Sequence, residues 1–390
     1  MHRTRLIVAI ATAAFAALPI AAQTKKPTAE QVFKNIQALK GIPVDDFMGT
    51  MGVMSAALGF DCSECHNNAG TVKVDWAADT PRKVIARRMV AMMATINKEN
   101  FSGRQMVTCW SCHHGRDHPA TTPALENVYG PGSQEMDDSL RQAPGQPTAD
   151  KILDKYLNAI GGAERLAAVK SFVANGSSVS FGGFGGGGKV EIYAQYPDRH
   201  AMYITFPKEP ERGSSNRVFN GKEGWLQTPL TVLGEYEQTG IELDGAHLDA
   251  QLAFPGQIKQ ALSDFRVSMP ISISDLPGPS SQTSQDTGTA AVGQDRLCNV
   301  VQGTGPHGML ATMYFDQESG LLVRLVRYGK TPIGRVPTQI DFGDYREVDG
   351  IKMPFRVLFA WLDGRDAIQL SDVKTNVQID AAKFAKPASK

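Results

Sequence analysis

Long apolar runs are scarce in this chain of 390 residues, and none is long enough to predict a membrane-spanning helix, which needs about 20 such residues. One apolar run, residues 6–18, follows Arg3 and Arg5, and the small residues Ala21 and Ala22 come after it. This arrangement is typical of a signal peptide with its cleavage site. No cysteine follows the run, so a lipid anchor is not indicated. We therefore expect residues 1–22 to be a signal peptide and the mature chain to be soluble and periplasmic.

An excess of charge of either sign is also lacking. Forty Lys and Arg side chains balance forty Asp and Glu side chains. Proteins that bind nucleic acids usually carry a strong basic excess, so the composition argues against such a partner. Cysteine is scarce as well, with five residues in the chain. One of them, Cys298, stands far from any histidine at ligand spacing, and we expect it to be a buried, unreactive thiol.

The other four cysteines fall in two copies of the pattern Cys-x-x-Cys-His, at residues 62–66 and 109–113. Such cysteines can form thioether bonds to the two vinyl groups of one porphyrin, and the adjoining histidine ligates the iron. Two disulfides, a thioredoxin-type redox pair or a zinc site are the alternatives, but a zinc site does not require histidine at the fifth place. The pattern predicts two covalently attached c-type haems. Their predicted binding residues are Cys62, Cys65, His66, Cys109, Cys112 and His113.

Up to about residue 118 the apolar residues recur with helical spacing. The faces are Val32, Phe33, Ile36 and Leu39; Phe47, Met51, Met54 and Leu58; and Ile85, Met89, Met92 and Ile96. Gly59 is expected to end the second helix, and Thr80-Pro81 to begin the third. The second and third segments each lead into one Cys-x-x-Cys-His motif. We interpret this as an internal repeat of helix, turn and haem motif.

Beyond residue 118 the pattern changes. Residues 119–147 hold five prolines among Gly, Ser and Thr, which predicts a linker. A short helical stretch, 152–160, ends at Gly161-Gly162. From about residue 171 apolar and polar residues alternate, as in 189–196 and 202–206, which is typical of strands. Asp349-Gly350 and Asp363-Gly364 predict hairpin turns, and the Gly-rich run 181–188 predicts a hairpin tip.

The predicted fold class is therefore a multidomain α + β chain. It comprises a signal peptide over 1–22, a helical dihaem cytochrome c domain over 23–118, a Pro-rich linker over 119–147, and an antiparallel β-rich domain with little helix over 148–390.

A six-coordinate haem needs a second axial ligand opposite the histidine, and methionine is frequent in cytochromes c. Spacing alone leaves Met48, Met51 and Met54 as candidates for the first haem. For the second haem it leaves Met89, Met92 and Met93, and His114 and His118 could compete for iron. A methionine stripe at helical spacing is also common in a packed core.

A resemblance narrows this choice. The runs Gly49-Thr50-Met51, 58–67, 86–92, Ile96-Asn97 and 107–115 resemble the cytochrome c subunit of photosynthetic reaction centres. In that family each haem unit is a helix bearing the axial Met, a turn and the Cys-x-x-Cys-His run. The resemblance implies Met51 and His66 as ligands of the first iron, and Met89 and His113 as ligands of the second.

The chain departs from that family in two ways. The reaction-centre members carry four haems, whereas this chain has motifs for two. Those members also have a histidine in the loop before the second motif, and residues 97–108 contain none. A photosynthetic reaction centre is therefore not implied as the partner. The two-haem unit is also similar to exported cytochromes of non-phototrophic bacteria.

The C-terminal half resembles the curved half-barrel sheets of periplasmic lipoprotein carriers, through residues 156–162, 349–355 and 363–366. Such a sheet can hold an apolar ligand on its concave face, or that face can be a packed core.

These observations predict an exported dihaem c-type cytochrome that carries single electrons between periplasmic donor and acceptor proteins. With both axial positions filled, neither iron is open to substrate, so no catalytic residues are expected. One alternative is a peroxidase-like dihaem enzyme with one five-coordinate iron and His114 or His118 as the acid–base group. Another is a protein that binds an apolar ligand and carries a redox-active haem domain.

Overall fold

The computed structural model describes residues 26–119, 121–122, 139–181, 187–229, 234–274, 295–362 and 364–387. The expected signal peptide and most of the expected linker lie outside these residues. One antiparallel sheet dominates the fold. Its strands are β1 (Ser171–Phe181), β2 (Gly188–Gln195), β3 (Arg199–Thr205), β4 (Ser214–Phe219), β5 (Gly224–Gln227), β6 (Tyr236–Gln238), β7 (Ser263–Val267), β8 (Ile271–Ile273), β9 (Arg296–Thr304), β10 (Leu310–Asp316), β11 (Leu322–Thr331), β12 (Gly334–Val348), β13 (Ile351–Trp361) and β14 (Gly364–Thr375).

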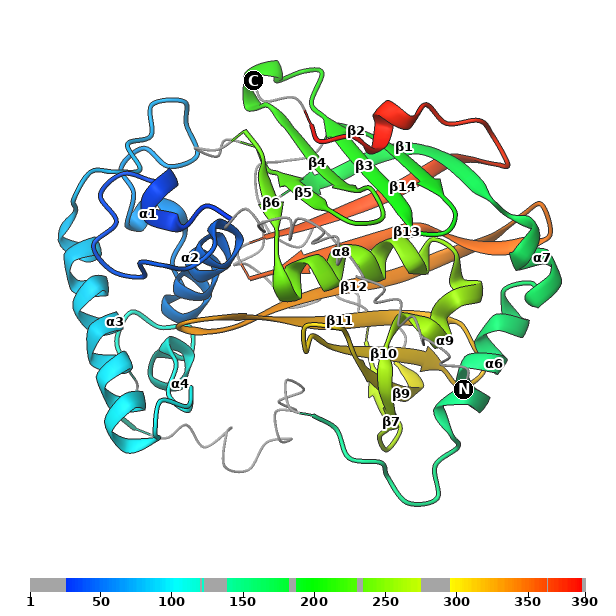
Figure 1. Cartoon of the computed structure of the whole chain (residues 1–390), viewed down its shortest axis with the longest axis horizontal. Helices are drawn as coiled ribbons and strands as arrows, with labels where there is room; N and C mark the ends of the chain where they lie inside the picture. Colours follow the sequence, from blue (N-terminus) through cyan, green and yellow to red (C-terminus); the bar gives the residue numbers. More distant parts are fainter. Residues whose placement is uncertain are drawn as a thin grey trace, which may run out of the picture.

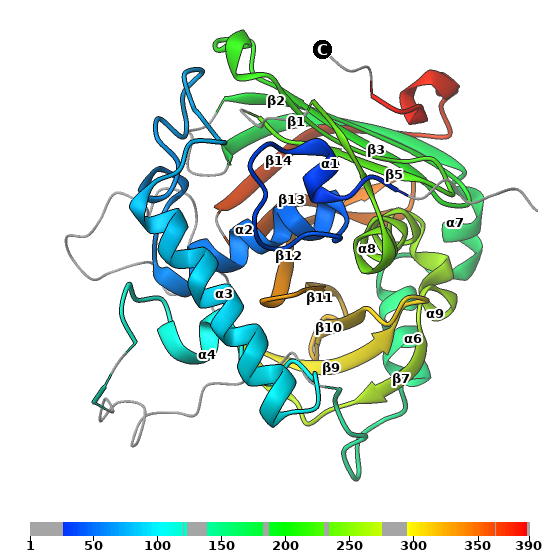
Figure 2. The same ribbon diagram turned by 60° about the vertical axis from the view of Figure 1, so that its left-hand side comes forward.

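The strand order is β6-β5-β4-β3-β2-β1-β14-β13-β12-β11-β10-β9-β7, with β8 beside β9. Most neighbours in this order are also neighbours in sequence and are joined by hairpins. Asp349 (φ 48°) and Gly350 (φ 81°) form the two-residue turn between β12 and β13, as their sequence predicts. The sheet curves around a row of helices on its inner face (Figures 1 and 2). The predicted antiparallel β-rich region is confirmed.

The described α-helices are α1 (Ala29–Val32), α2 (Val44–Leu58), α3 (Pro81–Asn100), α4 (Cys109–His113), α6 (Ala149–Ala159), α7 (Ala163–Ala168), α8 (Gly240–Leu252) and α9 (Ile258–Ala261). Local sequence accounts for several boundaries. Gly59 ends α2 in the left-handed conformation at φ 67°. The Thr80 side chain accepts the N–H of Lys83 at 3.3 Å and caps α3. Gly161 (φ 136°) and Gly162 (φ 82°) follow α6.

One expectation about helices is wrong, and one helix was not predicted. The face through Val32, Phe33, Ile36 and Leu39 is not helical beyond Val32. Asn35 adopts φ 59°, and its amide donates to the Ala77 carbonyl (2.8 Å), which ties this stretch to the loop before α3. The β-rich region contains little helix, as expected, but no pattern in the sequence predicted α8, whose 13 residues lie along the inner face of the sheet (Figure 1).

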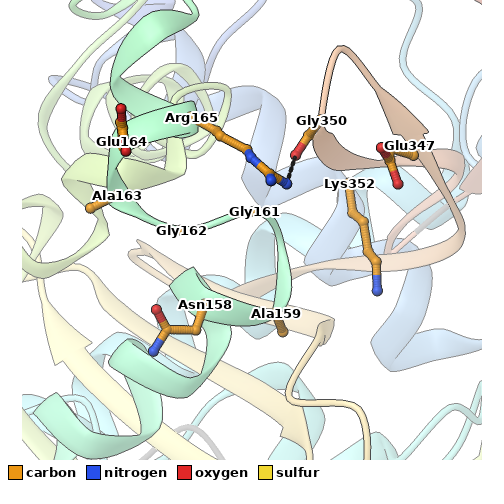
Figure 3. A pocket seen from close by; sticks show the side chains of 10 residues that line it. All are labelled: Asn158, Ala159, Gly161, Gly162, Ala163, Glu164, Arg165, Glu347, Gly350 and Lys352. Atoms are coloured by element: carbon orange, nitrogen blue, oxygen red, sulfur yellow. Dashed lines mark hydrogen bonds between the residues drawn. The ribbon is translucent and has the colours of Figure 1, made fainter.

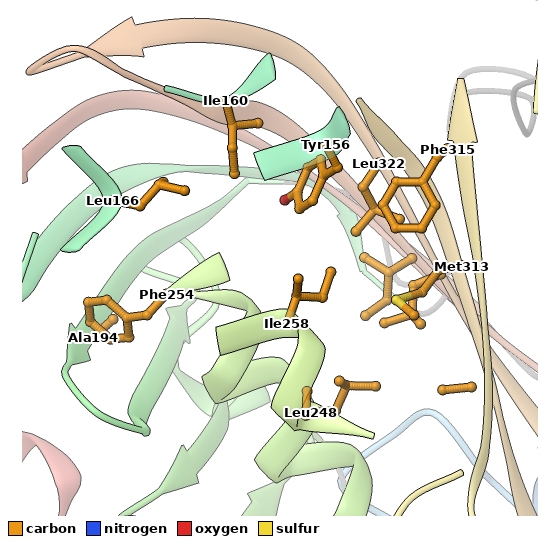
Figure 4. Packing of buried hydrophobic residues seen from close by; sticks show 14 of the residues in the cluster. Tyr156, Ile160, Leu166, Ala194, Leu248, Phe254, Ile258, Met313, Phe315 and Leu322 are labelled. Carbon is orange, nitrogen blue, oxygen red and sulfur yellow. The ribbon is translucent and has the colours of Figure 1, made fainter. Parts of the chain in front are cut away.

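The main core lies between the inner face of the sheet and helices α6, α8 and α9 (Figure 4). The cluster includes Tyr156 of α6, Ile160 just after α6, Leu248 of α8, Ile258 of α9 and Phe315 of β10, and all five are at most 5% exposed. Cys298 lies in a second, smaller cluster and is fully buried. Burial raises the pKa of its thiol to about 11, as expected for an unreactive cysteine.

The hairpin between β11 and β12 joins the sheet to helices α2, α3 and α4, which lie together at one end of the sheet (Figures 1 and 2). Ile333 at its tip is fully buried against Val53 of α2 and Val90 and Met93 of α3. Full burial of such a side chain stabilises the folded state by about 1.5–3 kcal/mol. The hairpin also makes two hydrogen bonds to the helical region, from Gln105 Nε2 to the Thr331 carbonyl (2.8 Å) and from the Cys109 N–H to the Ile333 carbonyl (3.2 Å).

The end of the segment that joins the helices to the sheet is described from residue 139. There the Leu140 N–H donates to Gln302 Oε1 (2.8 Å), and the Ala143 N–H donates to the Val267 carbonyl (2.8 Å). This stretch follows the β7 edge of the sheet. Among the described helices, none combines the length and the apolar character needed to cross a membrane.

Candidate haem-binding sites

The first motif lies directly after α2. The Asp61 side chain accepts the Ser63 N–H at 2.7 Å and caps a short 3-10 helix over Cys62–Glu64. The Thr80 hydroxyl then donates to the Cys65 carbonyl at 2.9 Å and fixes the motif to the start of α3. Gly59 is required at the preceding turn, because a Cβ there would lie 2.4 Å from the Gly115 carbonyl oxygen. The two haem motifs therefore approach each other at the end of α2.

A cavity of about 1560 Å³ opens beside the first motif. Cys62, Cys65 and His66 line it, together with the apolar face of α2 that includes Met51. The cavity extends past α2 to the inner face of the sheet. Ligand pockets for drug-sized molecules usually measure about 300–1,000 Å³, so a large planar group such as a haem can be accommodated here. Met48 and Met54 line the same cavity, and the preference for Met51 stays a prediction.

The environment of His66 suits an iron ligand. Its ring meets the Trp76 ring edge-on, with 4.9 Å between the centroids. Burial lowers the pKa of His66, and the positive charge of Lys83 acts in the same direction. The neutral imidazole favoured in this way is the form that binds a metal. Its Nδ1 is buried and lacks a hydrogen-bond partner in the described part of the chain.

The second motif forms helix α4. The Thr108 hydroxyl accepts the Ser111 N–H at 3.2 Å and caps the helix. The imidazole of His113 has its Nδ1 3.0 Å from the Arg116 carbonyl oxygen. With Nδ1 held by a backbone carbonyl, Nε2 is left to bind a metal, which is the usual arrangement around a ligating histidine. This local contact orients His113 without any partner from the sheet.

Apolar side chains are exposed on α3, the helix that precedes this motif in the chain. Ile85, Met89 and Met92 are 53%, 38% and 49% exposed, although they share one helical face. A haem plane packed on this face would cover them, so the residues fit the group. Met93 is 6% exposed and packs against Ile333, so core packing accounts for it. Met89 stays the predicted ligand.

The other uses of the cysteines find little support. All five thiols are free. Burial raises the pKa of Cys65, and it raises the pKa of Cys109 to about 11, whereas a redox-active pair needs a lowered thiol pKa. Within the described residues no group of three or more His, Cys, Asp or Glu side chains could hold a metal ion. The two motifs therefore do not combine into one zinc site there.

The histidines proposed for the enzyme alternative lie at the surface. His114 adopts φ 49°, and its ring meets Trp110 edge-on at 5.7 Å between centroids. The His118 side chain is 89% exposed, and its Nδ1 lies 3.6 Å from an Asp117 carboxylate oxygen.

Sequence reasoning missed the contribution of the sheet to the first cavity. His200, Arg217, Arg327 and Trp361 line it from the inner face. They come from four strands separated by up to 160 residues, and no motif connects them. A second missed contact joins α2 to α8, where the Asp45 carboxylate accepts the Thr239 N–H (2.5 Å) and hydroxyl (3.0 Å).

Acidic groups gather at this α2–α8 contact and predict a pH dependence. Burial raises the pKa of Asp46 to about 6, and the charges of Asp45 and Glu242 add to this. Because the folded-state pKa exceeds the usual value of about 3.9, the folded chain binds this proton more tightly than the unfolded chain. The protonated Asp46 carboxyl group therefore contributes fully to the free energy of unfolding below about pH 4, and this contribution is lost as the pH rises through 6.

Asp46→Asn should accordingly stabilise the protein at pH 7 by about 1 kcal/mol and have little effect at pH 4. A pKa shift of this size would correspond to about 3 kcal/mol of unfolding free energy for a fully buried group. The Asp46 carboxyl group is partly exposed, so we expect a smaller effect. Urea unfolding at both pH values measures the difference, with the exposed Glu99→Gln on α3 as the control. Equal effects of Asp46→Asn at the two pH values would contradict this linkage.

A smaller cavity, of about 480 Å³, lies between the end of α6 and the β12–β13 turn. Arg165 crosses it to donate to the Gly350 carbonyl at 3.3 Å (Figure 3). Its lining contains no Cys, His or Met. It therefore provides no candidate ligand for a haem.

The N-terminal region matches a known protein family. Residues 2–150 match the family described as the photosynthetic reaction centre cytochrome c subunit. A reaction centre cytochrome c subunit from Thermochromatium tepidum is 32% identical over 104 residues. These residues make up 25% of this chain and 24% of that one, so the chain spans about a quarter of the length of this curated relative.

Solved structures similar to the chain include a LolA superfamily protein from Nitrosomonas europaea. It has 14% identity and a TM-score of 0.38, and the match covers 62% of this chain and 99% of that one. Another is an outer membrane lipoprotein-sorting protein domain from Vibrio parahaemolyticus, with 10% identity and a TM-score of 0.34, covering 60% and 97%.

Proposed function

Because residues 2–150 match the reaction centre cytochrome c family, we propose that this chain is an exported dihaem c-type cytochrome that carries single electrons between periplasmic redox proteins. The observation that carries the proposal is the meeting of Met51, Cys62, Cys65 and His66 at one cavity. These are the two attachment groups and the two axial ligands that one c-type haem requires. A second set of the same composition follows in the chain, on α3 and α4.

In this proposal Cys62 and Cys65 hold the first haem, and His66 and Met51 ligate its iron. The second haem is held by Cys109 and Cys112. His113 and Met89 ligate the second iron. Haem supplies an iron that gains and loses one electron, and each proposed ligand pair leaves that iron no open position.

The protein supplies the environment of the two groups. With the haems in place, the apolar faces of α2 and α3 would pack against them and exclude water, and this would set the free-energy cost of changing the charge on each iron. The Arg116 carbonyl holds the His113 ring through Nδ1 (3.0 Å) and so fixes the orientation of Nε2.

Residues 1–22 would direct export to the periplasm, 23–118 would form the dihaem domain, 119–147 the linker, and 148–390 the β-rich domain. The partners would be periplasmic or membrane-bound electron donors and acceptors. The first cavity, which extends to the inner face of the sheet, leaves room for an apolar ligand as well.

The absorption spectrum of the oxidised protein tests this function. We expect two haems per chain by pyridine haemochrome assay, both low-spin, with the near-infrared band of Met-to-iron ligation. A high-spin component in the wild-type protein would contradict an electron carrier. It would favour the peroxidase-like alternative, with an iron open to substrate near His114 or His118.

A further inference from the structure

The inner face of the sheet presents an arginine to the first cavity without an acceptor for it. Arg217 lies on β4 opposite Met202 of β3, which belongs to the main core, so both point to the inner face. Its guanidinium carbon lies 4.6 Å from the Phe359 ring centroid and 5.8 Å from that of Trp361. Among the described residues no carboxylate or carbonyl forms an ion pair or hydrogen bond with this guanidinium. Stacking holds the group in place and leaves its N–H donors available.

Two carboxylates, Asp249 and Asp366, favour the charged form of Arg217, but neither forms an ion pair with it among the described residues. Asp249 forms its ion pair with Arg327 of β11. Asp366 accepts the Ser178 hydroxyl at 2.5 Å through Oδ1, and its buried Oδ2 has no hydrogen-bond partner in the described part of the chain. Burial lowers the pKa of Arg217, which shows that its surroundings do not fully compensate the charge. A further anion beside Arg217 would balance the remaining positive charge.

The other cations around the cavity already have partners. Lys83 donates to the carbonyls of Trp76 (3.0 Å) and Ala78 (2.6 Å). Arg87 donates to the Asp79 carboxylate at 2.7 Å. Arg365 also has an interaction partner. Arg87 and Arg327, which also line this cavity, have carboxylate acceptors, whereas the guanidinium of Arg217 has no acceptor in the described part of the chain.

A haem held by Cys62 and Cys65 brings two carboxylates into this cavity. The cysteines attach at the vinyl edge, so the two propionates lie at the far edge of the porphyrin and extend away from the motif. We infer that Arg217 binds a propionate of the first haem, so that the β-rich region completes the haem pocket across its interface with α2. This inference rests on the proposed function, because it requires a haem at the first motif. Arginine matches a carboxylate with two parallel hydrogen bonds.

A free carboxylate ligand would have the same chemistry, but the haem has an advantage over it. Covalent attachment gives its propionates an effective local concentration in the millimolar range or above. A free fatty acid reaches such a concentration only when it is added in excess. The haem is therefore the favoured source of the carboxylate.

The experiment uses the full-length protein with haem attached. It compares Arg217→Gln and Arg217→Lys with a control, Arg199→Gln, which removes the same charge from an exposed position on the neighbouring strand β3. Pyridine haemochrome assay first counts the haems, and a wild-type protein without haem at the first motif would refute the proposed function itself. Potentiometric titration then measures both midpoint potentials.

Arg217→Gln should lower the midpoint potential of the first haem and leave that of the second unchanged, because a nearby positive charge disfavours the oxidised iron. Arg217→Lys should retain most of the wild-type potential. Arg199→Gln should match the wild type. Equal potentials in Arg217→Gln and Arg199→Gln would overturn the assignment.

Two further measurements keep the assignment open to refutation. If Arg217→Gln does not fold, resonance Raman spectra of Arg217→Lys should show a shifted propionate bending band, and an unchanged band overturns the proposal. Added oleate distinguishes the source of the carboxylate. Suppose that the wild type and Arg217→Gln have the same midpoint potentials without oleate, and that oleate changes the haem spectrum of the wild type alone. The site then binds a free carboxylate, and the propionate assignment is wrong.

Discussion

Replacing Cys62 and Cys65 together by alanine should halve the haem content of the purified protein, from two haems per chain to one. Each motif carries its own pair of thiols for the proposed thioether bonds, and the two motifs lie on separate elements, the 3-10 helix Cys62–Glu64 and helix α4. Loss of one pair therefore removes one haem and leaves the other attached. Pyridine haemochrome assay, with protein made alongside a haem-attachment system, measures the ratio.

The reciprocal variant, Cys109→Ala with Cys112→Ala, should also retain one haem. The matched control is Cys298→Ala, which removes a fully buried thiol of the sheet and should keep both haems. Two haems in either double variant would contradict covalent attachment at that motif. Comparing the two double variants also assigns each midpoint potential to one motif.

Replacing Met51 or Met89 by alanine should convert one of the two haems from low-spin to high-spin and lower its midpoint potential. Loss of the thioether ligand opens one axial position and removes a ligand that favours the reduced iron. Axial ligands set haem potentials over about 0.8 V in all, and a fall of about 0.1 V is expected here. Absorption spectra and potentiometric titration report the two effects.

Neighbouring methionines provide the controls. Met48→Ala and Met54→Ala test the first haem, because both side chains line the same cavity as Met51. Met92→Ala tests the second from the exposed face of α3. Met93→Ala should keep both haems low-spin and instead destabilise the fold by about 2–5 kcal/mol, since it removes a buried side chain. A spin change in any of these four variants, with Met51→Ala and Met89→Ala unchanged, would refute the assignment.

Local signals in the sequence predicted the elements that depend on neighbouring residues. Gly59 ends α2, Thr80 begins α3, and Asp349-Gly350 turns β12 into β13, because each acts through a backbone conformation or a cap within a few residues. The sheet was predictable for the same reason, since alternation along one strand reports its own two faces. The haem motifs are also local, with all their residues within one turn.

The elements that the sequence did not predict depend on distant residues. Helix α8 contains Gly245, and glycine by itself disfavours a helix. The glycine allows α8 to approach β11 closely, because a Cβ at this position would lie 2.9 Å from Nε of Arg327. The stretch after α1 has helical spacing, but Asn35 binds the loop before α3 instead. Arg217 reaches the first cavity only through the curvature of the sheet, so no pattern around residue 217 could indicate it.

The β11–β12 hairpin has a consequence for the biogenesis of the protein. Its tip, Ile333, binds the backbone of Cys109, although the two residues are separated by more than half of the chain. A chain that emerges N-terminus first presents both pairs of thiols well before residues 331–334 follow. If haem is attached at Cys109 and Cys112 as proposed, it would be joined to an open polypeptide, and the hairpin would then close over a segment that already carries haem. A chain that folded first would already have the Cys109 backbone bonded to the hairpin.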